Sequence, residues 1–278
     1  MSAEFDLPSV ERGVLGTRFE ERVRHFTSVD STNELALIAA RAGAKWGAWI
    51  ADEQTAGRGR GGHTWYSAPG YGLYCSVLVT PQVPLADARN LPMAAGLAAR
   101  AAVLEATGLE LDLRWPNDLM FGDQKCGGIL VESASEAPPP EWGEVFGPAL
   151  KFAVIGIGLN VGHRGFPPEL RELATSLYLE SGREVTRETV LVPLLTYLDD
   201  EVQGIRRDFK GHHSHQSIYS RFAAASSWVA GKRVTVDEGG GYTGWTRGLN
   251  SQGFLQVEDE TGAMRTVLSG GVRSALEG

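Results

Sequence analysis

Short apolar runs separated by polar and glycine-rich stretches recur through the first two thirds of the chain. Runs of this length bounded by turn residues are typical of buried strands. They predict strands over 47–54, 72–80, 110–115, 128–132 and 152–161. Residues 133–147 are rich in Pro, Glu and Ser, so we expect an exposed loop before the last of these strands.

Three other segments have the apolar spacing of helices. The first begins at Ser31, whose hydroxyl is expected to cap it, with Glu34 completing a capping box. The second covers 91–107 and stops at Gly108, a residue typical of helix ends. The third lies between about 188 and 209 and has one apolar side.

The pattern changes after Gly231. Short alternating segments separated by glycine-containing turns predict strands over 232–236, 242–249, 254–258 and 263–267. We expect a small all-β unit, a closed barrel, that serves as a lid or docking element beside a larger domain of helices and strands.

The composition narrows the class of protein. Of 278 residues, 42% are hydrophobic and 22% are charged, as in ordinary soluble globular proteins. The net charge of -8 repels a nucleic-acid backbone, so any phosphate chemistry must use local positive charge. We find no signal peptide and no apolar run long enough for a membrane span, which predicts a cytoplasmic protein.

Two candidate sites are unconvincing. Cys75 and Cys126 have no metal-ligand spacing, and buried thiols are favoured over a disulfide. His212, His213 and His215 do not have the spacing of a compact metal site, so a solvated loop is favoured.

Residues 57–65 (GRGRGGHTW) are the most informative stretch. They match G-x-G-x-x-G and nearly match a P-loop, but both motifs need a helix directly afterwards, and the following residues are turn sequence. What remains is a loop whose arginines, Arg58 and Arg60, suit phosphate oxygens and whose Trp65 can stack on a base. The alternative is a solvated loop whose arginines have no role.

Two further motifs carry candidate chemistry. In R-W-P-N-D-L and K-C-G-G-I-L-V-E, Lys125 precedes a glycine pair and can stabilise developing negative charge, and Asp118 is a candidate magnesium ligand. In I-G-I-G-L-N-V, the glycines indicate a closely approaching ligand or backbone, and the Asn160 amide suits a base or ribose. Taken singly, these are also a solvated lysine, a turn at 117–118 and a strand packed through small residues.

Together, the motifs resemble those of biotin–protein ligases. Q-T-A-G-R-G-R-G-G-H-T-W, R-W-P-N-D-L, K-C-G-G-I-L-V-E and I-G-I-G-L-N-V occur in the family's order, preceded by S-T-N at 31–33. The resemblance runs from about His25 to Leu177. It implies an α+β fold: a mixed sheet flanked by helices over 1–230, related to class II aminoacyl-tRNA synthetases, and then an SH3-like β-barrel over 231–278.

The resemblance also implies roles for single residues. The catalytic residues would be Lys125, Arg58 and Arg60. The biotin site would consist of Ser31, Thr32, Asn33, Gln54, Gly57, Arg58 and Lys125. The ATP or adenylate site would consist of Arg58, Arg60, Trp65 and Asn160, with Asp118 near the metal.

The chain departs from the family pattern at two places. The family's loop usually has a long residue where Gly61 stands and often arginine where His63 stands, which predicts a looser grip on the adenylate. The family's repressor members carry an N-terminal helix-turn-helix domain. The segment before the first motif is too short for one, so no operator binding is expected.

The implied reaction is ATP-dependent, AMP-forming activation of biotin, followed by its transfer to a lysine of a biotin carboxyl carrier domain, with Mg²⁺ as cofactor. No nucleic-acid or membrane partner is expected, and a homodimer through a sheet edge stays open. Three alternatives remain: a lipoate or octanoate ligase or acyltransferase of the same fold, a non-catalytic biotin sensor, and a dinucleotide-dependent oxidoreductase.

Overall fold

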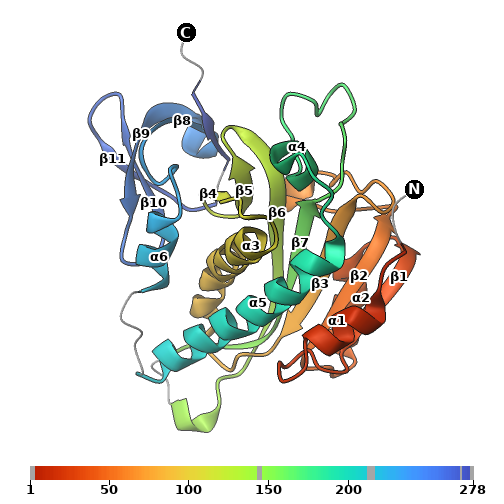
Figure 1. The fold of residues 1–278 in the computed structure, drawn as a ribbon. Helices are drawn as coiled ribbons and strands as arrows, with labels where there is room; N and C mark the ends of the chain where they lie inside the picture. The colour runs from red at the N-terminus through yellow and green to blue at the C-terminus, as the bar shows by residue number, and fades with distance from the viewer. Residues whose placement is uncertain (1–3, 143–145, 212–216, 270, 276–278) are drawn as a thin grey trace.

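The computed structural model describes residues 4–142, 146–211, 217–269 and 271–275. They form a large sheet with helices packed on it and a second, smaller sheet beside it (Figure 1). The histidines at 212, 213 and 215 lie outside the described residues.

The larger sheet has seven strands in the order β1-β2-β3-β7-β6-β5-β4. β1 and β2 are parallel and all other neighbours are antiparallel, so the sheet is mixed, as expected. The strands are β1 (Val23–Val29), β2 (Gly47–Gln54), β3 (Gly72–Val79), β4 (Asp112–Arg114), β5 (Asp118–Phe121), β6 (Gln124–Glu136) and β7 (Ala149–Asn160).

Helices cover both faces of this sheet. α3 and α5 lie side by side on one face (Figure 1), where Val77 and Ile155 belong to the main core. The adjacent residues Leu78 and Val154 point to the opposite face and pack against α2. The helices are α1 (Leu7–Gly13), α2 (Thr32–Arg41), α3 (Leu91–Thr107), α4 (Leu177–Ser181), α5 (Arg187–Phe209) and α6 (Ile218–Ala224), with short 3-10 segments η1 (Arg60–Gly62), η2 (Leu85–Asn90), η3 (Pro140–Trp142) and η4 (Glu238–Gly240).

The two long helices were predicted from the sequence and are confirmed. α3 ends at Gly108, which has a φ of +75° and donates its N–H to the Leu104 carbonyl at 2.8 Å. This left-handed conformation is one that glycine adopts without strain. α5 begins after Thr186, whose hydroxyl accepts the N–H of Thr189.

The capping box predicted at α2 is wrong. The Ser31 side chain makes no capping hydrogen bond. Instead, the backbone N–H of Thr32 donates to Oε1 of Gln54 at 2.9 Å, and Glu34 pairs with Arg58 at 3.3 Å. Partners from other elements therefore satisfy the groups that a local cap would have used.

The structure also adds and lengthens elements. α1, β1 and β5 have no clear signal in the sequence pattern because each is short and its burial depends on distant partners. The predicted loop over 133–147 is wrong at its start, since β6 continues to Glu136, which pairs with Ala149 of β7.

The smaller sheet is antiparallel, with the order β11-β10-β9-β8-β12, and has the expected SH3-like character. Its strands are β8 (Ala230–Val236), β9 (Tyr242–Leu249), β10 (Leu255–Asp259), β11 (Met264–Val267) and β12 (Val272–Ser274). Two tryptophans join it to the larger sheet: the Trp115 indole donates to the Gly253 carbonyl at 3.0 Å, and Arg114 lies over the Trp228 ring, 5.0 Å from its centroid.

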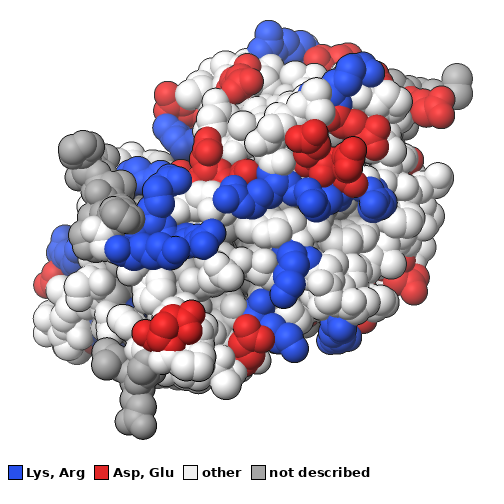
Figure 2. Space-filling view, turned by 90° about the horizontal axis from the view of Figure 1, so that it is seen from below, with Lys and Arg blue, Asp and Glu red and all other residues white. Residues whose placement is uncertain are grey.

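The prediction of two buried thiols is confirmed. Cys75 and Cys126 are free and buried, and burial raises the pKa of the Cys75 thiol to about 12. Seen from below, basic side chains form a band across the molecule, with acidic side chains along its upper side (Figure 2). In the described part of the chain, no helix combines the length and the apolar character that crossing a membrane requires.

One buried imidazole lies outside these patterns. His163 is 3% exposed, stacks on Phe166 with 5.0 Å between ring centroids, and is flanked by Tyr66 and Tyr71. Neither ring nitrogen has a hydrogen-bond partner among the described residues. Because burial disfavours the charged ring, the pKa of His163 falls to about 4.

We predict that His163 makes the fold sensitive to acid. The unfolded chain binds this proton near the ordinary pKa of histidine, about 6.5, and the folded chain only near 4. The contribution of His163 to stability is therefore complete above about pH 6.5 and declines as the pH falls toward 4, by about 2 kcal/mol at about pH 5. Urea unfolding at about pH 7.5 and 5 should show this loss in the wild type and its absence in His163→Phe. Equal pH dependence in both proteins would contradict the prediction.

Candidate active site

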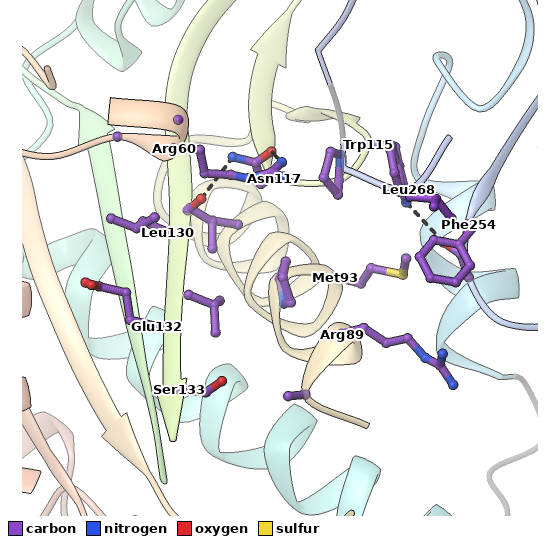
Figure 3. A pocket seen from close by; sticks show the side chains of 18 of the residues that line it. Arg60, Arg89, Met93, Trp115, Asn117, Leu130, Glu132, Ser133, Phe254 and Leu268 are labelled. Atoms are coloured by element: carbon purple, nitrogen blue, oxygen red, sulfur yellow. Dashed lines mark hydrogen bonds between the residues drawn. The ribbon is translucent and has the colours of Figure 1, made fainter. Parts of the chain in front are cut away.

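Two adjoining cavities lie where the larger sheet meets residues 57–65, which we call the Gly/Arg loop. The smaller, of about 50 Å³, is bounded by the start of α2 and by strands β2, β3, β6 and β7. The larger, of about 730 Å³, lies between the loop, the start of α3, the middle of β6 and the SH3-like unit (Figure 3). Both cavities share a wall made of Arg58, Gly59, Arg60, Asn117, Ile129 and Leu130.

Buried polar groups line the smaller cavity. Ser31, Thr32 and Asn33 are each less than one tenth exposed. The Thr32 hydroxyl lies 3.1 Å from Gln54 Oε1 and 2.7 Å from Ser76 Oγ. Buried hydroxyls and amides need hydrogen-bond partners, so this cluster is suited to a ligand with several donors and acceptors.

Asn33 links this cluster to β6. Its Oδ1 accepts from Ser76 Oγ at 2.5 Å, and its Nδ2 donates to Oε2 of Glu132 at 2.8 Å. A Cβ on Gly156 would lie 2.2 Å from Asn33 Oδ1, far inside contact distance. Glycine at 156 is therefore required for the Asn33 side chain to reach its partners.

Trp65 fills a trough on β6 and β7 where two glycines lack side chains. A Cβ on Gly158 would lie 2.5 Å from its indole, and one on Gly128 would lie 3.3 Å away. The Lys125 ammonium is 5.6 Å from the centroid of the ring. The buried indole N–H has no acceptor among the described residues. If the loop moved, the Trp65 indole would leave the trough and open space above Gly128 and Gly158.

Lys125 is held by an acidic partner. Its ammonium lies 2.6 Å from Oδ1 of Asp118, while Arg114 donates two hydrogen bonds to Oδ2, at 2.6 and 3.0 Å. Burial alone raises the pKa of Asp118, but the two cations outweigh it and hold that pKa below its usual value. The carboxylate therefore stays ionised and fixes the lysine beside the trough.

This geometry does not fit the magnesium role expected for Asp118. Magnesium requires several oxygen ligands in near-octahedral geometry, and both oxygens of Asp118 are already taken by cations. No group of three His, Cys, Asp or Glu side chains in the described ranges is arranged to hold a metal. The carboxylate instead orients Lys125 and Arg114.

The two loop arginines are tied to different elements. Arg58 lies 3.3 Å from Glu34 and 3.4 Å from Glu132. Arg60 donates to Asn117 Oδ1 at 2.8 Å and also to the carbonyl of Ser269 in the SH3-like unit. The loop is thus held on one side by α2 and the larger sheet and on the other by the C-terminal unit.

Two glycines of the loop allow backbone conformations that a side chain would hinder. A Cβ on Gly57 would lie 2.7 Å from the Trp65 carbonyl, and the Gly57 carbonyl accepts the Trp65 N–H at 2.9 Å. Gly61 has a φ of +62°, which a long side chain rarely adopts. The family departure at 61 therefore suits the turn that the chain makes here.

The structure also differs from the sequence analysis at Asn160 and at Asn117. Asn160 lines neither cavity; its buried amide donates to the carbonyls of Thr175 at 2.9 Å and Lys125 at 3.5 Å. In this conformation its amide nitrogen stabilises the backbone around Lys125. Asn117, interpreted as a turn signal, lines both cavities and donates to the Ile129 carbonyl at 3.0 Å.

The contribution of the C-terminal unit was also missed. Gln252, Gly253, Phe254 and Leu268 line the larger cavity, and Figure 3 shows Phe254 and Leu268 beside Trp115. Their only sequence signal is the alternating pattern of the unit itself. Sequence spacing gives no indication that they face a motif more than a hundred residues earlier.

The chain is similar to known proteins in both sequence and fold. A model of the biotin/lipoate A/B protein ligase family matches residues 25–139. The biotin–[acetyl-CoA-carboxylase] ligase of Mycobacterium tuberculosis is 30% identical over 249 residues, which cover 87% of this chain and 84% of that protein. The bifunctional ligase/repressor BirA of Bacillus spizizenii is 29% identical over 237 residues, which cover 84% of this chain and 68% of that protein.

The fold is also similar to that of a biotin protein ligase of known structure. The biotin protein ligase from Aquifex aeolicus in complex with biotin and ATP superimposes with a TM-score of 0.72 and is 28% identical. The match covers 92% of this chain and all of that one. By sequence and by fold, the chain belongs to the biotin/lipoate protein ligase family, among its biotin–protein ligases.

Proposed function

We propose that the chain adenylates biotin with ATP and transfers the biotinyl group to a lysine of a biotin carboxyl carrier domain. The observation that carries this proposal is the junction of the two cavities. A small polar recess and a larger cavity meet at Arg58, Arg60 and Asn117, with the ammonium of Lys125 facing the smaller one. Such a junction suits a reaction that joins a small acid to a large nucleotide and then exposes the product to a protein.

The recess suits the ring end of biotin. A cyclic urea offers two N–H donors and one carbonyl acceptor, which need matching partners when buried. Hydroxyl and amide groups joined by hydrogen bonds come from Thr32, Asn33, Gln54 and Ser76, and Ser31 lines the same cavity. The acyl chain would then run along the glycine trough toward Lys125.

The recess must enlarge for biotin to bind. Its 50 Å³ is well below the roughly 300 Å³ that small-molecule sites usually have at the least. Trp65 fills the adjoining trough, so its departure would open the space that the acid needs. Loop movement of this kind also allows the loop to close over a reactive intermediate and exclude water.

In the first step, a carboxylate oxygen of biotin attacks the α-phosphorus of ATP. A bond from that oxygen to phosphorus forms, the bond to the bridging oxygen breaks, and pyrophosphate leaves. Lys125, Arg58 and Arg60 are the cations that would offset the developing negative charge. No covalent protein nucleophile is needed.

In the second step, the amine of the acceptor lysine attacks the acyl carbon of the mixed anhydride. An amide bond forms, the bond from carbon to phosphate oxygen breaks, AMP leaves, and the amine gives up a proton. The larger cavity provides room for a lysine side chain to approach. Asn117 lines both cavities, so its amide would contact both the acid and the nucleotide.

We predict that Lys125→Ala reduces biotin-dependent exchange of pyrophosphate into ATP by a factor of about 100 to 1,000, because a cation that stabilises the transition state is lost. Lys151→Ala, an exposed lysine on β7, is the matched control and should keep wild-type exchange. Lipoate and octanoate are compared with biotin in the same assay. Exchange driven by either of them and not by biotin would move the chain to the sister ligases, and biotin binding without any exchange would indicate a sensor.

We predict that Asp118→Asn lowers the rate of exchange by about tenfold or more, because Lys125 and Arg114 lose their shared charged partner. The concentration of Mg²⁺ that gives half-maximal exchange should stay unchanged, since Asp118 acts on the lysine. A large rise in that concentration would instead show that Asp118 binds the metal.

A further inference from the structure

The SH3-like unit presents three large apolar side chains to solvent. Trp245 of β9 is 47% exposed, Met264 of β11 is 56% exposed, and Leu268, directly after β11, is 58% exposed. A buried aromatic ring contributes strongly to an interface, and a solvated one contributes nothing to the core. Packing within the unit therefore gives no reason for these three side chains to be large and apolar.

The strand register brings two of these side chains together. Glu258 of β10 pairs with Trp245 on one side and with Met264 on the other. Directly paired residues of neighbouring strands project to the same face, so Trp245, Glu258 and Met264 form one row across three strands. The alternate positions Thr246 and Val257 are fully buried, so the row lies on the outer face.

From this row, strand β11 runs toward the larger cavity. Leu268 follows Met264 by four residues, a separation of roughly 13 Å along an extended chain. Leu268 lines that cavity together with Phe254 (Figure 3). β11 is an edge strand, and Figure 1 shows it on the outer side of the molecule. We call Trp245, Met264 and Leu268, with their paired neighbours on β9, β10 and β11, the outer barrel face.

Charged side chains alternate with the apolar ones on this face and neutralise one another. Arg247 lies 2.6 Å from Glu258, and Arg233, which pairs with Trp245 across β8 and β9, lies 3.2 Å from Glu260. Tryptophan, methionine and arginine are enriched in protein–protein interfaces relative to the rest of a protein surface. Balanced charge does not favour a nucleic-acid backbone, which requires an excess of cations.

We propose that the acceptor's carrier domain docks on the outer barrel face while its target lysine reaches into the larger cavity. This rests on the proposed function and adds the surface that recognises the acceptor. The carrier domain is the favoured occupant because the face runs to the mouth of the cavity where the lysine must arrive. A second copy of this chain on the same face would cover that mouth and hinder transfer.

The test compares Trp245→Ser, Met264→Ser and their double variant with the wild type. Leu15→Ser is the matched control, since Leu15 is 63% exposed and follows α1 on the larger domain. Three quantities are measured: direct binding of the cognate apo carrier domain, the KM for that domain in biotin transfer, and biotin-dependent pyrophosphate exchange without acceptor. Circular dichroism and thermal unfolding check the fold, and Met264→Ser, on an edge strand, is the variant least able to disturb it.

We expect the double variant to bind the carrier domain about tenfold or more weakly and to raise its KM by a similar factor, as loss of a central tryptophan usually does. Pyrophosphate exchange and the Leu15→Ser protein should stay at wild-type values. Unchanged carrier binding in the double variant, or no carrier binding by the wild type, would overturn the docking surface. Absence of exchange in the wild type would overturn the proposed function, while the binding measurement would still decide the surface.

Discussion

The carboxylate of Asp118, shared between two cations, is the interaction on which the rest of the site depends. It holds Lys125 at 2.6 Å from one oxygen and Arg114 at 2.6 Å from the other. Arg114 lies over the Trp228 ring, and Lys232 lies over the same ring, 4.5 Å from its centroid. One partly buried carboxylate therefore joins Lys125 to the start of the SH3-like unit. Because two cations surround it, neither can change position without leaving a charge unpaired.

The second constraint is the alternation of glycine and isoleucine on β7. Ile155 and Ile157 point into the core between the sheet and its long helices. Gly156 and Gly158 point to the other face, where Asn33 and Trp65 approach the strand too closely for any side chain. A strand of period two can thus be core on one side and binding surface on the other. In the I-G-I-G motif, the isoleucines belong to the core face and the glycines to the binding face.

Features with a local physical cause were predictable from the sequence, and features set by distant partners were not. The stop of α3 at Gly108, the strands of the SH3-like unit and the close approach at the β7 glycines follow from backbone preferences and periodicity. The failed cap at Ser31 and the role of Asn117 follow from Gln54 and Arg60, which reach these positions only through the tertiary fold. Asn160 shows the same limit: its amide faces backbone carbonyls that no motif specifies.

The contact of Arg60 with the Ser269 carbonyl has a consequence for biosynthesis. The strands that carry Lys125 and the glycine trough lie well before residue 252 in the chain, and domains generally fold as they emerge, N-terminal part first. These strands are therefore synthesised before the residues that provide one wall of the larger cavity and one anchor of the loop. The larger cavity gains its last wall, and the loop its second anchor, only when the C-terminal unit docks beside the larger sheet.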